Sequence, residues 1–299
     1  MDKFRSGFIT VVGRPNAGKS TLINQILKQK VAIISDKPQT TRNRIQAVYT
    51  TDHAQLVFID TPGIHKPKSR LGEYMNEVAY SAVRHVDVVL FMISAHEPLG
   101  SGDRFILNQL EGTDSPVFLV LNKIDLIPKD KLLPLIDDYK EEYPFAEIIP
   151  ISALTGDGVD PLLETIISYL PEGPKYYPDH FVTDHPESFV ISELIREKVL
   201  LLTREEIPHS VAVGIDQLSK REESDIIDVM ATIIVERQSQ KRILIGKGGR
   251  MMKEIGTLAR KDIEHLLGSK VYLELWVKVV KDWRNKQQVL SEYGYRLTE

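Results

Sequence analysis

The chain has 299 residues, of which 42% are hydrophobic and 27% are charged, and it contains no cysteine. This length favours two domains that each bury a core, and the lack of cysteine excludes disulfides, thiolate catalysis and cysteine zinc sites. No apolar run approaches the roughly 20 residues that cross a bilayer, and the N-terminus lacks the pattern of a secretory signal, so we expect a soluble cytoplasmic protein.

The net charge of −4 conceals an uneven distribution. Residues 237–286 carry 13 Lys and Arg against 5 Asp and Glu, whereas residues 1–236 carry 24 against 35. Such segregation indicates that one part of the chain meets a polyanion. The alternative is a solvated basic helix face.

From residue 8 to about 170, apolar runs of strand length alternate with helical stretches. The runs are rich in β-branched residues and lack polar alternation, which is typical of buried parallel strands. They lie at residues 8–12, 55–59, 86–93, 117–121 and 147–152. The helical candidates lie at residues 19–28, 73–84, 103–110, 130–142 and 160–170. Apolar and polar residues alternate in residues 44–50, which is typical of a hairpin strand that pairs with the second run. The whole pattern predicts an α/β fold with a mostly parallel, doubly wound sheet and one antiparallel strand.

The stretch LPEGPKYYPDHF, residues 170–181, interrupts this pattern because its prolines and glycine disfavour both helix and strand. Beyond it we expect an α-β-β-α-β order and therefore a smaller α+β domain. The expected elements are a helix at 189–202, strands near 209–218 and 226–238, a helix at 250–267 and a strand at 271–280. The predicted boundaries are a first domain over 1–172, a linker over 173–188, and a second domain with a C-terminal tail over 189–299.

The segment GRPNAGKS, residues 13–20, matches the phosphate-loop pattern GxxxxGK[ST] between a strand and a helix. Its glycines allow backbone N–H groups to turn toward phosphates at a helix N-terminus. Lys19 would reach the β- and γ-phosphates, and Ser20 would offer its hydroxyl to Mg²⁺. The residues predicted to bind nucleotide here are Gly13, Arg14, Pro15, Asn16, Ala17, Gly18, Lys19, Ser20 and Thr21.

The segment DTPG, residues 60–63, ends the second apolar run. Asp60 at this strand end would hold Mg²⁺ through a water, and Gly63 would present its N–H to the γ-phosphate because it has no side chain. The residues predicted to line the nucleotide here are Asp60, Thr61, Pro62, Gly63 and Ile64.

The segment NKID, residues 122–125, indicates a guanine base. Asp125 would accept hydrogen bonds from N1–H and the 2-amino group of guanine, and adenine offers no equivalent pair, which argues against an ATP-dependent phosphotransferase. Asn122 and Lys123 would tie this loop to the phosphate loop and cover the base. After the next strand, a backbone N–H of the SAL segment, which we assign to Ala153, would reach the guanine oxygen. The residues of that segment are Ser152, Ala153 and Leu154.

The order and spacing of these motifs resemble the translation-factor-like GTPases and, within them, the Era family, whose members join a GTPase domain to a KH RNA-binding domain. The resemblance covers nearly the whole chain and implies GTP and GDP as ligands, Mg²⁺ as cofactor and hydrolysis of GTP to GDP and phosphate. It also implies that PQTTRNRI, residues 38–45, is a switch segment. Thr41 of this segment, or alternatively Thr40, would bind Mg²⁺ with Ser20 and Asp60.

Ile64 departs from the better-known signalling GTPases, which place a glutamine at this position to orient the attacking water. An aliphatic side chain cannot align water, so hydrolysis would depend on Mg²⁺ and the remaining site residues, or on a group supplied elsewhere. The catalytic residues implied are Lys19, Gly63 and Thr41. We therefore expect slow intrinsic turnover that a partner stimulates, with His65 and Arg42 as candidate helpers.

A second glycine loop, GKGG at residues 246–249, fits the GxxG pattern and lacks the spacing of a second phosphate loop. In KH domains this loop clamps the backbone of about four single-stranded nucleotides, and nearby cations and a helix N-terminus meet the phosphates. We expect the loop to lie between a strand and a helix, in the prokaryotic (type II) KH arrangement, with Met251, Met252, Leu258 and the apolar positions of 271–280 in the core. The predicted RNA-binding residues are Lys241, Arg242, Ile245, Gly246, Lys247, Gly248, Gly249, Arg250 and Lys253.

The resemblance further implies that the RNA is the 3′ end of 16S ribosomal RNA and that the protein, a monomer, acts in assembly and maturation of the small ribosomal subunit. A nucleotide-stabilised RNA-binding scaffold with negligible turnover is the alternative. We expect GTP to order residues 38–45 and 63–70 and so to reposition the KH domain. The basic tail KDWRNKQQVL, residues 281–290, would dock on its own domain or, alternatively, contact the inner face of the cell membrane peripherally.

Overall fold

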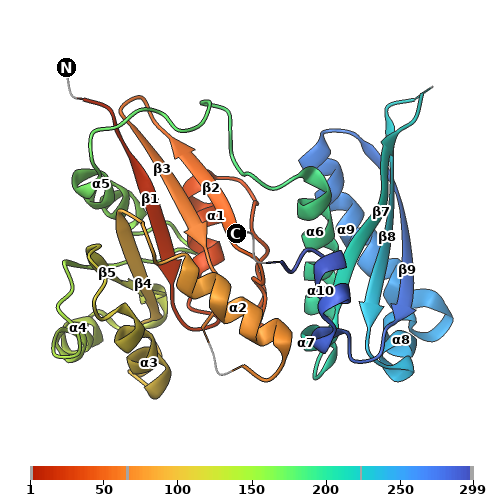
Figure 1. The fold of residues 1–299 in the computed structure, drawn as a ribbon, viewed down its shortest axis with the longest axis horizontal. Coiled ribbons are helices and arrows are strands. Elements are labelled where there is room, and N and C mark those ends of the chain that lie inside the picture. The colour runs from red at the N-terminus through yellow and green to blue at the C-terminus, as the bar shows by residue number, and fades with distance from the viewer. Residues whose placement is uncertain (1–2, 65–66, 223, 297–299) are drawn as a thin grey trace. The chain divides into compact units, whose positions relative to one another are not determined.

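The computed structural model describes residues 3–64, 67–222 and 224–296, and the chain divides into two compact units (Figure 1). Unit 1 contains Met1–Ala32, Thr41–Pro67 and Gly72–Asp184. Unit 2 contains Ile33–Thr40, Lys68–Leu71 and His185–Glu299. Two short segments of the N-terminal half therefore belong to the unit that the C-terminal half forms.

Unit 1 alternates strands and helices in the predicted order. Its strands are β1 (Arg5–Val12), β2 (Ile45–Thr50), β3 (Ala54–Asp60), β4 (Val88–Ser94), β5 (Val117–Asn122) and β6 (Glu147–Pro150). Its helices are α1 (Lys19–Leu27), α2 (Arg70–Ser81), α3 (Ser101–Leu110), α4 (Leu132–Lys140) and α5 (Val159–Tyr169), with short 3₁₀ turns η1 (Ile124–Leu126) and η2 (Lys129–Lys131). The sheet has the order β2-β3-β1-β4-β5-β6, in which β2 is antiparallel and the other pairings are parallel.

Both faces of this sheet are buried, which explains the continuous apolar runs in its strands. Alternate residues of one strand, such as Phe58 and Ile59 of β3, belong to different core clusters. One cluster includes α1 and α5, and the other includes residues of α2, α3 and α4. The predicted doubly wound α/β sheet is therefore confirmed, and parallel strands direct the loops after β1, β3, β5 and β6 to one edge.

The proline-rich stretch after α5 is irregular, as its composition predicts, but it is bound along unit 1. Glu172 bridges Arg5 of β1, and Thr183 bridges Ala47 of β2. Between them, the Oε1 of Gln55 accepts hydrogen bonds from the backbone N–H groups of Tyr176 and Tyr177 at 2.7 and 2.9 Å. This part of the chain is therefore held in place by backbone and side-chain hydrogen bonds.

Unit 2 packs most of its helices on one face of a sheet of order β7-β8-β9. Its strands are β7 (Ala212–Lys220), β8 (Ile226–Val235) and β9 (Lys270–Val279), with β7–β8 antiparallel and β8–β9 parallel. Its helices are α6 (Glu187–Leu202), α7 (Ile207–Ser210), α8 (Gln238–Ile245), α9 (Arg250–Leu267) and α10 (Gln287–Glu292), with 3₁₀ turns η3 (Lys247–Gly249) and η4 (Trp283–Asn285). None of the helices within the described ranges is long and apolar enough to span a membrane.

The expected strand over residues 226–238 ends early, at Val235, and the next residues form helix α8, which the periodicity did not indicate. The Oε1 of Gln240 accepts hydrogen bonds from the backbone N–H groups of Glu236 and Arg237, both at 2.9 Å. This side chain satisfies donors at the helix start and turns the chain out of the sheet. The GKGG loop consequently lies between two helices, and the expectation of a strand before it is wrong.

The basic tail docks on its own unit. Trp283 is fully buried, and its Nε1–H donates to the carbonyl of Ser210 at 2.8 Å. Leu290 of α10 is also buried, and a Cβ added at Gly214 of β7 would lie 2.9 Å from the Tyr293 ring. The apolar residues of the tail are thus used in packing within unit 2.

Candidate functional site

The loop between β1 and α1 has the close backbone packing that its glycines permit. A Cβ at Gly13 would lie 2.2 Å from the carbonyl oxygen of Met92, and a Cβ at Gly18 would lie 2.1 Å from the Nδ2 of Asn122. Gly18 also has a left-handed φ of 101°. The first turn of α1, which includes Thr21, contains no acidic residue. A helix N-terminus of this kind favours a bound phosphate.

Lys19 lies folded back over this loop. Its Nζ donates to the carbonyls of Gly13 and Arg14 at 3.1 and 3.0 Å. Burial lowers the pKa of the Lys19 ammonium to about 8, and the nearby Asp60 carboxylate opposes that shift. The protein thus holds a cation at the phosphate loop at neutral pH in surroundings of low polarity, where it interacts strongly with phosphate oxygens.

Three predicted metal ligands from different segments meet beside Lys19. The hydroxyl of Ser20 donates to the Oδ2 of Asp60 at 2.7 Å, and the hydroxyl oxygens of Ser20 and Thr41 are 2.9 Å apart. Thr41 Oγ1 is 3.4 Å from the same Asp60 oxygen. The Thr40 hydroxyl instead donates to the carbonyl of Lys37 at 2.6 Å. The structure therefore brings Thr41, and not Thr40, to this site.

These oxygens fit Mg²⁺. The cation prefers oxygen ligands with carboxylate and hydroxyl character. Asp60 is fully buried, which raises the pKa of its carboxyl group, although Lys19, Ser20 and Thr41 oppose the shift. Its Oδ1 has no hydrogen-bond partner among the described residues. A buried carboxylate oxygen without a partner is costly, and a bound cation would relieve that cost.

The DTPG segment packs directly on the phosphate loop. Thr61, which is buried, donates its hydroxyl proton to the carbonyl of Val11 at 2.8 Å, and Pro62 is also buried. A Cβ at Gly63 would lie 2.8 Å from the backbone nitrogen of Pro15, so only glycine fits this approach. Ile64 is buried in the core cluster that includes α2 and α3, which agrees with its expected inability to orient water.

Asn122 joins the three loops that the sequence assigns to nucleotide binding. Its Nδ2 donates to the carbonyl of Ala17 at 2.8 Å, and its Oδ1 accepts from the backbone N–H of Ala153 at 2.9 Å. The side chain is only 2% exposed. Asn122 and Lys123 were predicted to form this tie together, but the hydrogen bonds to both loops come from Asn122.

The predicted guanine contacts lie at the same edge of the sheet. Asp125 is exposed in η1, while Lys123 is half-buried, which lowers the pKa of its ammonium. Ser152 and Ala153 are buried, and the neighbouring Leu154 is exposed. The backbone N–H groups of Ser152 and Ala153 donate to the carbonyl of Asp157 and to the Oδ1 of Asn122. The contact with guanine that this arrangement supports is therefore the one through the exposed carboxylate of Asp125.

Some predicted residues have other partners. Arg14 forms ion pairs with Glu97 and Asp103 at 2.8 and 2.9 Å, so its side chain is engaged within unit 1. Asn16 is exposed. Of the candidate helpers, Arg42 is fully buried, and His65 lies outside the described residues.

In unit 2 the GKGG loop connects α8 to α9 by a tight turn. Gly246, Gly248 and Gly249 have left-handed φ values of 71°, 61° and 77°. A Cβ at Gly246 would lie 2.8 Å from the Cβ of Met251, whereas nothing lies within 4 Å of a Cβ at Gly248 or Gly249. The second and third of these glycines therefore leave open space at the surface, where a backbone can approach closely.

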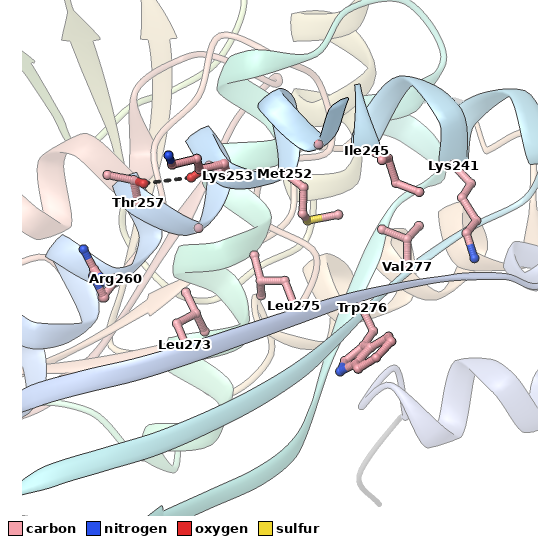
Figure 2. A pocket seen from close by; sticks show the side chains of 12 residues that line it. Lys241, Ile245, Met252, Lys253, Thr257, Arg260, Leu273, Leu275, Trp276 and Val277 are labelled. Atoms are coloured by element: carbon pink, nitrogen blue, oxygen red, sulfur yellow. Dashed lines mark hydrogen bonds between the residues drawn. The ribbon is translucent and has the colours of Figure 1, made fainter. Parts of the chain in front are cut away.

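Beside this loop is a groove of about 670 Å³ between the helices α8 and α9 and strand β9 (Figure 2). Among the predicted RNA-binding residues, Lys241, Ile245, Gly249 and Lys253 line it. Arg242, Lys247, Gly248 and Arg250 are exposed near it without lining it. The residues that sequence reasoning missed are Met252, Gly256, Thr257, Arg260, Leu273, Leu275, Trp276 and Val277.

Most of the missed residues form the apolar side of the groove. Leu273, Leu275 and Val277 are alternate residues of β9 that also pack against the core of unit 2. Met252 was expected to be a core residue, but it contacts the groove as well as the core. The alternation in YLELWV could have identified these positions, because one face of an edge strand beside a helix is available to a ligand.

Within unit 2, helix α6 holds the loop segment Ile33–Thr40. The Arg196 guanidinium is fully buried, is paired with Glu193 and donates to the carbonyls of Gln39 and Thr40. The backbone N–H of Ile34 donates to Glu197 at 3.0 Å. The residue that follows this segment is Thr41, which lies against Ser20 and Asp60.

These features define a phosphate-loop domain with a guanine-type base motif, followed by a domain with a GxxG groove. The family models that match are "50S ribosome-binding GTPase" over residues 8–123 and "KH domain" over residues 206–284. A single-residue variant of Era from Aquifex aeolicus, crystallised with GDP and AlF4⁻, is 44% identical over 98% of this chain and 100% of its own, with a TM-score of 0.95. An Era structure in complex with MgGDPNP and nucleotides 1506–1542 of 16S ribosomal RNA is also 44% identical, with the same coverage and a TM-score of 0.96.

The chain belongs to the Era family of GTPases, with a GTPase domain followed by a KH domain.

Proposed function

We propose that this protein binds and hydrolyses GTP and binds single-stranded RNA from the 3′ end of 16S ribosomal RNA during assembly and maturation of the small ribosomal subunit. The observation that carries the proposal is the convergence of Ser20, Thr41 and Asp60 beside the phosphate loop, in a chain that also has a GxxG groove. Support comes from the Era structure in complex with both MgGDPNP and 16S ribosomal RNA.

In the proposed reaction, water attacks the γ-phosphorus of GTP, and the bond between this phosphorus and the β–γ bridging oxygen breaks. Lys19 would leave the carbonyls of Gly13 and Arg14 and donate to the β- and γ-phosphate oxygens. The N–H of Gly63 would donate to the γ-phosphate. Mg²⁺, when bound by Ser20, Thr41 and Asp60, would neutralise charge on the phosphates.

The slow intrinsic hydrolysis of GTP expected at this site follows from Ile64. This side chain is buried in an apolar cluster and has no group that positions water. The rate of phosphate release in a single turnover, measured with and without RNA, separates the GTPase from a scaffold that hardly turns over. We expect Thr41→Ala to lower this rate at least tenfold and Thr40→Ala, the matched control, to leave it unchanged. Turnover that is rapid without RNA would contradict the expectation from Ile64, and its absence under both conditions would favour the scaffold.

We also propose that the nucleotide state controls RNA binding through the segment 33–40. Arg196 and Glu197 of α6 bind this segment, and Thr41 beside it is the ligand expected to respond to GTP and Mg²⁺. A change in the position of Thr41 would therefore strengthen or break the hydrogen bonds from Arg196 to the carbonyls of Gln39 and Thr40.

The test compares RNA affinity in GDP with that in a non-hydrolysable GTP analogue. Arg196→Lys keeps the charge opposite Glu193 but cannot form the same set of hydrogen bonds to two carbonyls. We expect the affinity ratio between the two nucleotide states to shrink in this variant, while nucleotide affinity is retained. The proposal fails if the wild-type affinities are equal in the two states.

We place the protein in the cytoplasm, in accord with its lack of cysteine. A peripheral membrane contact by the tail is the alternative. The burial of Trp283 and Leu290 supports a tail that is committed to its own unit, because these are its main apolar side chains. Vesicle sedimentation with anionic lipids checks this point.

A further inference from the structure

Strand β9 presents a large aromatic side chain that neither the nucleotide site nor the core uses. Trp276 is 59% exposed, whereas Trp283, the other tryptophan of the chain, is fully buried. An exposed indole ring offers a flat apolar face on which a nucleobase can stack.

The position of Trp276 connects it with the groove. It is one of the residues that line the groove, and its ring lies on the opposite side of β9 from Leu275 and Val277 (Figure 2). In the described sheet, β9 is an edge strand, since its strand neighbour is β8. A chain that leaves the groove over this free edge would meet the ring of Trp276 first.

The opposite face of the sheet is open around Trp276 but closed further away. Across the sheet, Trp276 is in register with Thr232 of β8, which is in register with Gly214 of β7. Gly214 lies under the Tyr293 ring, so the tail covers the β7 end of this row. The exposed ring therefore lies at the β9 end, next to the groove.

Neighbouring groups suit a nucleotide. Lys278, two residues further along the same face, is exposed and can contact a phosphate. Tyr272 is also exposed, but Arg221 lies 5.4 Å from its ring centroid and is itself fixed by Asp228. Trp276 is therefore the aromatic residue with the open face, and stacking on it requires no particular base.

We infer that Trp276 is a base-stacking site that extends the KH groove: RNA that fills the groove continues around the edge of β9 and stacks a base on the indole ring. This inference rests on the RNA binding proposed above. A KH groove holds about four nucleotides, so the added contact lengthens the RNA segment that the protein reads. Stacking of one base on an aromatic side chain corresponds to about 5- to 150-fold in affinity.

The test uses the full chain and two synthetic single strands from the 3′ end of the small-subunit ribosomal RNA, one of about five nucleotides and one of about ten, because the groove alone holds about four. Affinities are measured by fluorescence anisotropy in both nucleotide states. We expect Trp276→Leu to weaken binding of the longer RNA at least fivefold and to leave the shorter RNA unchanged. Trp276→Phe, which keeps an aromatic face, should retain most of the affinity.

A second readout uses the two tryptophans. Because Trp276 is exposed and Trp283 is buried, we expect acrylamide to quench Trp276 far more readily. The longer RNA should therefore protect the emission of the wild-type chain, and the shorter RNA should not. The protection should be absent in Trp276→Leu. Thermal unfolding verifies that each variant is folded, which an exposed position allows.

The control for the groove is Lys253→Glu, which should weaken both RNAs. If wild-type protein binds neither RNA, the proposed RNA function fails and the inference fails with it. If the wild-type protein binds both RNAs but Trp276→Leu leaves the affinity for the longer RNA unchanged, or lowers the affinity for both RNAs equally, only the stacking site is refuted. Quenching that changes with protein concentration and not with RNA would assign this face to contact between two copies of the chain.

Discussion

Replacement of Asn122 by alanine is the most direct test of how the nucleotide site is assembled. The Asn122 side chain binds the carbonyl of Ala17 and the N–H of Ala153, and both of these residues are buried. In Asn122→Ala one acceptor and one donor lose their partners in the interior. Each such loss costs about 1–3 kcal/mol, so we expect the free energy of unfolding of unit 1 to fall by about 3 kcal/mol.

This loss has two measurable consequences. The melting temperature of unit 1 should fall by roughly 6–12 °C, given about 2–4 °C per kcal/mol for a unit of this size. The affinity for GDP should also fall, because Asn122 orients the phosphate loop, the base loop and the SAL loop together. Calorimetric unfolding and titration with a fluorescent GDP derivative give the two values.

Asn108→Ala is the matched control, since Asn108 is an exposed residue of α3. Asn122→Asp is a second variant that keeps the acceptor for the Ala153 N–H but loses the donor to the Ala17 carbonyl. It should be at least as destabilising as Asn122→Ala, because a carboxylate would then face a carbonyl oxygen. The reasoning is refuted if Asn122→Ala melts within about 2 °C of Asn108→Ala.

Three further predictions concern base choice, pH and the buried charges of unit 2. Asp125→Asn should weaken GDP binding at least about 100-fold, since two hydrogen bonds to a charged acceptor are lost. Xanthosine diphosphate, which has an oxygen in place of the 2-amino group, should restore binding to this variant. Unchanged GDP affinity would instead revive an ATP-dependent function. Burial lowers the pKa of Lys19 to about 8, so the unfolded state binds more protons between about pH 8 and 10.5, and this residue adds stability as the pH rises through that window. GDP phosphates favour the charged ammonium, so calorimetric titration at about pH 8.5 in buffers of different ionisation enthalpy should detect proton uptake that is absent in Lys19→Met. Lys198→Met should lower the free energy of unfolding of unit 2 by about 2–4 kcal/mol in urea titrations. The reason is that the Lys198 ammonium forms ion pairs with Glu197 and Asp262 at 2.6 and 2.5 Å. Equal stability of variant and wild type would show that the remaining carboxylates are adequately solvated.

The sequence by itself was sufficient to predict the nucleotide chemistry of this protein. Close approach of backbone to phosphate requires glycine at fixed local spacing, as predicted for the segment 13–20. Guanine recognition requires a carboxylate that follows a strand, the role predicted for Asp125. These requirements act within a few residues, so the corresponding motifs can be recognised in the sequence without knowledge of the fold. The same holds for the parallel strands, whose continuous apolar runs follow from burial on both faces.

Only the tertiary structure decided which neighbours complete each site. Thr40 and Thr41 are adjacent and chemically alike, and only the path of the loop shows that Thr41 reaches Asp60. Helix α8 starts where the Gln240 side chain caps the backbone, a contact that competes with continuation of a β-branched strand.

The groove beside the GKGG loop was not predicted from the sequence, for the same reason. Leu275 and Val277 have the apolar alternation of ordinary core residues, and their second role exists because β9 is an edge strand that faces α8 and α9. Trp276, on the other side of that strand, becomes distinctive only when its exposure is known. Local spacing reveals a motif, but exposure and long-range contact depend on which segments meet when the chain folds.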